Sequence, residues 1–315
     1  MRYILENEKL RIEVDSFGAE LKSVKSKNDD REYMWYADKK YWARTSPVLF
    51  PFVGSVKNKE YILDGKAYPM GQHGFARDME HSIVSQTEDT LWFKLDSNED
   101  TLAKYPFAFS LRIGYQLIDN SVKVLWEVEN PGDKELPFSI GAHPAFICPV
   151  GEDESKEGYK ISFGKLMEND NDERWMNTTV DPFAETVPVS EIHHHGNTRD
   201  TGLAISEDIL LPVKGGMCEI TPGFFDRCTY MIEGNQANSV GLVDPSGHEF
   251  VTVLFDTPLF AIWSPEEKNA PFVCIEPWYG RCDHVDFEGE LKDREYTNII
   301  AHGEKFHTEY VMRYN

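Results

Sequence analysis

Apolar side chains recur at every second position along much of this chain. They do so over Phe107–Leu117 and again over Val122–Val128, with Asp119-Asn120 between the two runs. Alternation with period two is typical of strands that bury one face, and an Asp-Asn pair suits a tight turn. We therefore predict a long antiparallel hairpin over these two runs.

Further runs of the same period predict a large all-β fold. The runs lie at Leu10–Val14, Leu91–Leu95, Val251–Phe255 and Phe306–Tyr314. No segment of a dozen residues keeps a helical stripe, so helix should be minor. We predict two large antiparallel sheets packed face to face, a β-supersandwich, in a single domain over residues 1–315. The stretch Gly151–Gly196, rich in charge runs, is interpreted as a long loop excursion from this domain.

The excess of acidic side chains limits the kinds of molecule that the chain can bind. The 315 residues include 54 acidic and 32 basic side chains, a net charge of −22, and the basic ones are scattered. A nucleic acid or an anionic membrane would be repelled. No uncharged stretch suits a membrane helix, and no apolar signal core follows the first residues. We expect a cytoplasmic monomer or homodimer that binds a small molecule, with neither nucleic acid nor membrane as partner.

The cysteines and histidines do not predict a metal site. The five cysteines show no C-x-x-C spacing, which favours free thiols in a reducing compartment. A site made of Cys274, Cys282 and His284 matches no zinc pattern. The triplet His193-His194-His195 could not converge on one ion from a strand, because successive side chains alternate in direction. We interpret the triplet as part of an exposed loop beside Gly196-Asn197.

Polar chemistry instead gathers in three strand-like segments. In the first of them, Ser139–Phe146, His143 follows Gly141-Ala142 where an apolar strand stops. Binding groups are commonly displayed at such ends, although a core histidine satisfied by hydrogen bonds would have the same surroundings.

A second segment, Cys274–Arg281, carries Glu276 directly after an apolar strand. A carboxylate there is costly without a partner, so it is either paired, for instance with Arg281, or a base with a shifted pKa. Trp278 and Tyr279 could present flat faces to a sugar ring or simply pack in the core.

The third segment, Gln72–Asp78, holds His73 and Arg77. The arginine could fork onto an oxygen-rich ligand or form an ion pair with Asp78 or Glu80. Together the three segments offer two imidazoles, a carboxylate, a guanidinium and aromatic rings, which suits acid–base work on a neutral polyol.

These segments resemble the aldose 1-epimerase (galactose mutarotase-like) family, and most closely its LacX-like branch. The strings that carry the resemblance stand in the family's order: Gly18–Leu21, Pro47–Pro51, His73–Asp78, Gly141–Phe146, Ile262–Ser264 and Cys274–Trp278.

The resemblance implies a galactose mutarotase-like supersandwich that interconverts hexose anomers without metal or organic cofactor. By position, Glu276 resembles the general base, His143 the general acid and His73 a second active-site histidine. Asp226 resembles the family's substrate-binding aspartate.

One departure concerns sugar binding. The galactose mutarotases carry an Asn-Arg pair where this chain has Asn58-Lys59. Lys59 is the expected substitute in substrate binding, with Arg77 and Trp278, but lysine lacks the planar fork of arginine. Galactose specificity therefore does not follow from the resemblance.

Two alternative functions remain open. A hexose-6-phosphate mutarotase would need basic groups beyond Arg77, for which Arg44, Lys57 and Lys59 are candidates. A non-catalytic carbohydrate-binding protein would need no acid–base pair. For the enzyme, His143 must be protonated and Glu276 ionised, so we expect a nearby carboxylate to favour the charged imidazole and the pH–rate profile to be bell-shaped.

Overall fold

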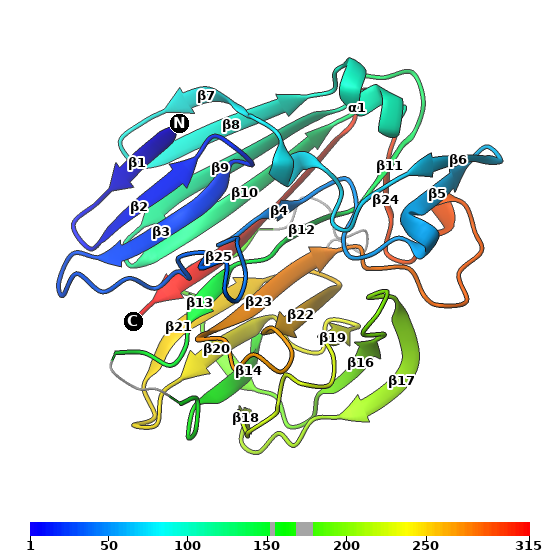
Figure 1. The fold of residues 1–315 in the computed structure, drawn as a ribbon. Helices are drawn as coiled ribbons and strands as arrows, with labels where there is room; N and C mark the ends of the chain where they lie inside the picture. The colour runs from blue at the N-terminus through cyan, green and yellow to red at the C-terminus, as the bar shows by residue number, and fades with distance from the viewer. Residues whose placement is uncertain (152–154, 168–178) are drawn as a thin grey trace.

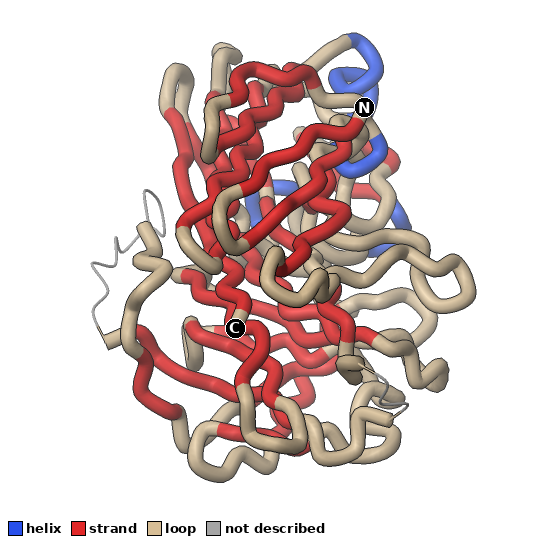
Figure 2. The backbone as a smooth tube through the Cα atoms, turned by 90° about the vertical axis from the view of Figure 1, so that its left-hand side faces the viewer, coloured by secondary structure: helices blue, strands red, loops and turns tan. Residues whose placement is uncertain are grey.

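The computed structural model describes residues 1–151, 155–167 and 179–315, and antiparallel strands are its dominant regular structure (Figures 1 and 2). Helix in these residues is confined to α1 (Glu99–Lys104) and the 3-10 turns η1 (Lys57–Lys59), η2 (Ala76–Asp78) and η3 (Leu291–Asp293). None of the described helices is long and apolar enough to cross a membrane. The predicted all-β class is confirmed.

The strands form two large sheets and three small ones. The ten-stranded sheet contains, in spatial order, β15 (Thr186–Pro188), β14 (Lys160–Leu166), β20 (Ser239–Val243), β21 (Glu249–Phe255), β25 (Lys305–Tyr314), β10 (Ser121–Glu129), β9 (Ser110–Ile118), β8 (Thr90–Asp96) and β7 (Ser82–Gln86), with β18 (Met217–Glu219) paired to β14. The eight-stranded sheet contains β17 (Ala204–Leu210), β16 (His193–Asn197), β19 (Tyr230–Glu233), β22 (Leu259–Trp263), β23 (Phe272–Tyr279), β12 (Ile140–Ala142) and β4 (Val48–Leu49), with β13 (Ala145–Ile147) paired to β23. The small sheets are β1 (Arg2–Glu6), β2 (Leu10–Asp15) and β3 (Glu20–Ser26); β11 (Leu136–Phe138) and β24 (Asn298–Ile300); and β5 (Glu60–Leu63) and β6 (Lys66–Pro69).

The predicted hairpin is the pair β9–β10, which lies between β25 and β8 in the ten-stranded sheet (Figure 1). Its alternate residues are buried as the sequence period requires, and Asp119 in the turn has a positive φ of 54°. The other runs became β2, β8, β21 and β25, each with its apolar positions buried.

The two large sheets enclose a shared hydrophobic core. Tyr279 of β23 packs edge-on against Phe306 of β25, and its hydroxyl contacts the Thr308 hydroxyl at 2.6 Å. Val273 and Ile275 lie in the same core cluster. The odd-numbered residues of β23 therefore face the other sheet, which turns Cys274, Glu276 and Trp278 to the opposite face.

Two interpretations of the chain's middle are wrong. The stretch Gly151–Gly196 is not a mere loop excursion, because it supplies β14 and β15 and begins β16; its acidic runs at 152–154 and 168–173 lie outside the described residues. The histidine triplet is in β16 rather than in an exposed loop, and only its middle member, His194, is buried. The alternation of its side chains holds, so the three imidazoles do not converge.

Candidate active site

Strand register places Glu276 and His143 opposite each other. Both β12 and β13 pair with β23, through Gly141 with Trp278 and through Ala145 with Cys274. The two pairings keep one continuous register across the break between β12 and β13, where His143 lies. This sets His143 across from Glu276, and their Nε2 and Oε2 atoms are 3.3 Å apart.

The floor of the site is a row of side chains across three strands. Met231 of β19 pairs with Ala261 of β22, which pairs with Glu276 of β23, so all three share a face. Met231 and Glu276 line a cleft of about 470 Å³. Between them lies Ala261, whose side chain is small, and the Glu276 carboxyl is part of the cleft lining.

Two tryptophans hold the His143 ring. Trp42 stacks on it at 4.6 Å between centroids, and Trp263 meets it edge-on at 5.3 Å. Both indoles also line the cleft. The imidazole is thereby fixed in orientation and shielded from water on its faces.

Burial sets the protonation of this pair. It lowers the pKa of His143 to about 3, with a further contribution from the positive charge of Arg77. It raises the pKa of the Glu276 carboxyl well above its ordinary value, and the nearby Trp278 indole opposes this rise. The expectation that a neighbouring carboxylate would favour charged His143 is wrong for the empty site, because desolvation outweighs that attraction. Both directions favour a neutral imidazole beside a protonated carboxyl.

His73 stands beside His143, with ring centroids 5.6 Å apart. Its Nδ1 accepts the backbone N–H of Gly54 at 3.1 Å, which assigns the ring proton to Nε2 and makes that atom a donor. Burial holds the pKa of His73 well below its ordinary value, so the ring stays neutral. Gly54 has a φ of 72°, and a Cβ there would lie 2.5 Å from the Cys282 side chain, so only glycine fits.

Arginines enter the cleft from loops. Arg77 donates to the Gln72 carbonyl at 2.7 Å, and burial together with the charge of Arg44 lowers its pKa to about 10. Arg44 pairs with Asp78 at 2.7 Å, whereas Arg77 lies 3.8 Å from the same carboxylate. Two guanidinium groups thus share one carboxylate, which leaves this end of the cleft with excess positive charge.

The structure brings five of the seven predicted site residues into this cleft: Glu276, His143, His73, Arg77 and Trp278. Trp278 is nevertheless largely packed, in a cluster with Leu49 and Val53, so its flat face serves the core more than the cleft.

Lys59 and Asp226 do not line the cleft. Asn58 and Lys59 both have positive φ, and Lys59 is exposed in the turn that they form. Asp226 accepts the backbone N–H of Glu267 at 2.8 Å, and its carbonyl accepts a hydrogen bond from Arg199. Asp226 therefore contacts Arg199, which does line the cleft, through its backbone.

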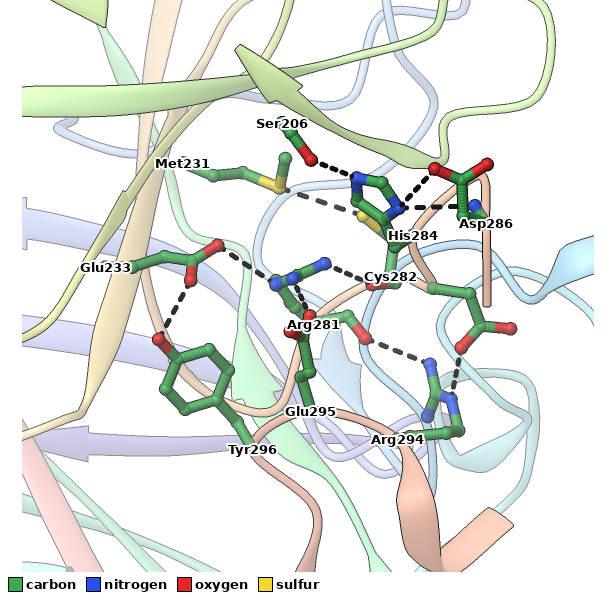
Figure 3. Close-up of polar contacts among 11 residues, drawn as sticks. Ser206, Met231, Glu233, Arg281, Cys282, His284, Asp286, Arg294, Glu295 and Tyr296 are labelled. Carbon is green, nitrogen blue, oxygen red and sulfur yellow. Dashed lines mark hydrogen bonds and ion pairs between the residues drawn. The ribbon is translucent and has the colours of Figure 1, made fainter. Parts of the chain in front are cut away.

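The segment that follows β23 closes one side of the site through its own polar contacts (Figure 3). Arg281 lies between Glu233, at 3.0 Å, and Glu295, so it is not the partner of Glu276 that the sequence allowed. Figure 3 also shows the Cys282 thiol against the Met231 sulfur, at 3.7 Å, and His284 against the Ser206 hydroxyl, at 2.8 Å. The Cys282 thiol and the His284 imidazole therefore contact different side chains, Met231 and Ser206.

Among the cleft residues that sequence reasoning missed are Trp42 and Arg199. Both lie in segments without strand periodicity, so the pattern that predicted the strands could not single them out. The nearest sequence signals were the string Trp42-Ala43-Arg44 and the polar run Asn197–Asp200, whose ends line the cleft.

The chain is similar to known proteins over nearly its whole length. Residues 1–296 match the family model described as aldose 1-epimerase. The plasmid-encoded and chromosomal LacX proteins of Lactococcus lactis subsp. lactis are each 29% identical over 297 residues, which cover 92% of this chain and 91% of theirs.

Two solved structures share the fold closely. The galactose mutarotase related enzyme from Lactobacillus acidophilus is 32% identical, with a TM-score of 0.86, and the match covers 100% of this chain and 97% of that one. A galactose mutarotase-like protein from Lactobacillus casei is 26% identical, with a TM-score of 0.86 and 100% of both chains covered.

The histidines should separate in a pH titration followed by NMR of the imidazole nitrogens. Between about pH 8 and pH 5, His143 and His73 should stay neutral, because burial lowers both pKa values. Exposed His193 should gain its proton in this range, since Glu191 and Asp208 raise its pKa. A His143 ring that titrates alongside His193 would contradict the buried single-proton pair.

Proposed function

The chain belongs to the aldose 1-epimerase family, and we propose that it is a mutarotase that interconverts the α and β anomers of a free hexose. The observation that carries the proposal is the 3.3 Å contact between His143 Nε2 and Glu276 Oε2 at the floor of a cleft. Mutarotation needs one group to accept a proton and another to donate one, both within reach of a single acetal carbon.

We assign Glu276 as the base and His143 as the acid. Glu276 takes the proton of the C1 hydroxyl while His143 protonates the ring oxygen, so the C1–O5 bond breaks and the aldehyde forms. Rotation about C1–C2 presents the other face of the aldehyde. The two proton transfers then run backwards, the C5 hydroxyl attacks C1, and both residues regain their starting states.

This assignment requires the shared proton to cross from Glu276 to His143 when sugar binds. A sugar hydroxyl that donates to the carboxylate stabilises its ionised form and lowers its pKa. The imidazolium that results then lies beside a carboxylate rather than alone in a buried site. The 3.3 Å contact is the path for this transfer.

The other cleft residues hold the sugar and the base in place. The Nε2–H of His73 is a neutral donor for a sugar oxygen, and Arg77 supplies a forked one. The Trp278 indole lies near the Glu276 carboxyl and favours its ionised form. These donors would also be useful in a carbohydrate-binding protein that has no enzymatic activity, whereas such a protein would not need the His143–Glu276 pair.

A hexose 6-phosphate is the second candidate substrate, and the arginines favour it. Arg44, Arg77 and Arg199 all line the cleft, although Arg199 is paired with Glu267 at 2.9 Å. Of the basic groups that the sequence suggested for phosphate, Arg44 is in place. Lys57 instead donates to the Phe287 carbonyl, and Lys59 is outside the cleft.

Anomer exchange measured by polarimetry on a panel of free and phosphorylated hexoses tests both candidates. We expect kcat/KM for glucose or galactose to exceed that for glucose 6-phosphate, because Asp78 and Glu267 already neutralise much of the arginine charge. The reverse order would establish the phosphorylated substrate. Binding of sugar without exchange of any anomer would leave only the carbohydrate-binding function.

Glu276→Gln should lower kcat by about 10²-fold or more with little change in KM, because it keeps the shape and removes the proton acceptor. Glu266→Gln is the matched control, since Glu266 lines the same cleft but lies 3.7 Å from Arg199 rather than beside His143. Equal rates in the two variants would reject Glu276 as the base.

The pH profile of kcat/KM should be flat from about pH 5 to about pH 8. A second proton joins the pair only near the lowered pKa of His143, about 3, and the last proton leaves only above the raised pKa of Glu276. The acid and alkaline limbs of the pH profile therefore report macroscopic pKa values of the His143–Glu276 pair and not of either residue alone. His143→Asn should abolish this pH profile and remove most of the rate. His73→Asn should leave the shape of the profile unchanged. A limb near pH 6.5 in the unmodified enzyme would show that His143 titrates freely.

A further inference from the structure

A third ligand-type side chain lies against the His143–Glu276 pair. Cys274 precedes Glu276 by two residues in β23, so its thiol is on the same face of the strand. One nitrogen, one sulfur and one carboxylate oxygen from these three side chains lie within 4.8 Å of one another, and all three residues are buried. Sequence spacing alone could not predict this cluster, because strand pairing brings His143 to the other two.

The spacing fits a tetrahedral cation. Zinc bonds of about 2.0–2.2 Å to nitrogen and oxygen put adjacent ligand atoms roughly 3.3 Å apart. The His143 Nε2 and Glu276 Oε2 atoms are 3.3 Å apart. The Cys274 thiol lies within 4.8 Å of both atoms, so a modest shift of the three side chains would complete the set. A fourth position faces the cleft, since His143 and Glu276 both line it.

The charges also match. A thiolate, a carboxylate and a neutral imidazole together balance a divalent cation. Burial keeps His143 in the neutral form that binds metals, but it also raises the pKa of the Cys274 thiol and of the Glu276 carboxyl, so the ion must displace a proton from each. The charges of Arg44 and Arg77 oppose a cation here, so both anionic ligands are needed to hold it. Thiolate and imidazole ligands favour zinc, copper or cobalt over magnesium or calcium.

We propose that His143, Cys274 and Glu276 form a reversible binding site for Zn²⁺, and that the bound ion inhibits the enzyme. The ion takes the place of the proton that the His143–Glu276 pair shares, so neither residue can transfer a proton while it is bound. The inhibition rests on the proposed mutarotase function, whereas the binding site does not.

Cobalt spectroscopy tests the site without reference to activity. Tag-free protein, first treated with EDTA and desalted, is titrated with Co²⁺ alone. We expect one equivalent to give thiolate-to-cobalt charge-transfer absorption and the visible bands of a four-coordinate ion, both displaced by Zn²⁺. Absence of thiolate absorption in the folded, unmodified protein would overturn the site.

Two cysteine variants identify the thiolate. Cys274→Ser should lose the charge-transfer band, whereas Cys282→Ser should keep it, because the Cys282 thiol faces the Met231 sulfur instead of the cluster. The reverse result would overturn the assignment. If Cys274→Ser fails to fold, the Co²⁺ spectrum of the protein carrying Cys282→Ser still decides, because this variant lacks the thiol that lines the cleft and a band that persists points to Cys274.

Inhibition is measured as the Zn²⁺ concentration that halves each protein's own rate after EDTA treatment. Cys274→Ser should raise this concentration about 10-fold or more, Cys282→Ser should leave it unchanged, and Mg²⁺ should not inhibit. An increase in rate with Zn²⁺, or equal sensitivity of both variants, would overturn the inhibitory role. If no sugar is turned over, the proposed function fails while the cobalt spectra still judge the site.

Discussion

The structure depends on a carboxyl group and an imidazole that are buried side by side. Either charge alone would be costly at this depth, but one proton shared between Glu276 and His143 leaves the pair neutral overall. The neighbouring features maintain this arrangement. Trp42 and Trp263 exclude water from the ring, and the Trp278 indole favours the ionised carboxyl. A site poised in this way can move a proton without creating a net charge inside the protein.

The alternation of β23 divides the structural and chemical roles between its two faces. Val273, Ile275 and Tyr279 bind the two large sheets together, while Cys274 and Glu276 face the other way. Rigid strands therefore position the proton-transfer groups. The groups that contact a ligand's periphery, such as Arg44 and Arg199, come instead from loops, so they can differ among relatives without disturbing the pair.

Sequence reasoning predicted best what depends on local pattern. The period-two runs predicted strands such as β9 and β10, and Glu276 stood out as a charge in an apolar run. Its partner was not predictable from spacing: Arg281 is near in sequence, yet strand pairing supplies His143. Lys59 was expected in the cleft because the sequence does not show the positive φ values of the turn that contains it. The triplet beginning at His193 was predicted as a loop because Gly196-Asn197 follows it, and glycine and asparagine are depleted in strands.

The break between β12 and β13 also bears on how the chain folds. His143 reaches Glu276 only when short strands on both sides of it have paired with β23, which is far away in the sequence. Contacts of such long range are slow to form, because the intervening chain must lose its freedom before they stabilise anything. The proton-sharing pair is thus assembled late, after the locally paired hairpin β9–β10 can already exist. A refolding chain would recover strand content before it recovers the chemistry of its cleft.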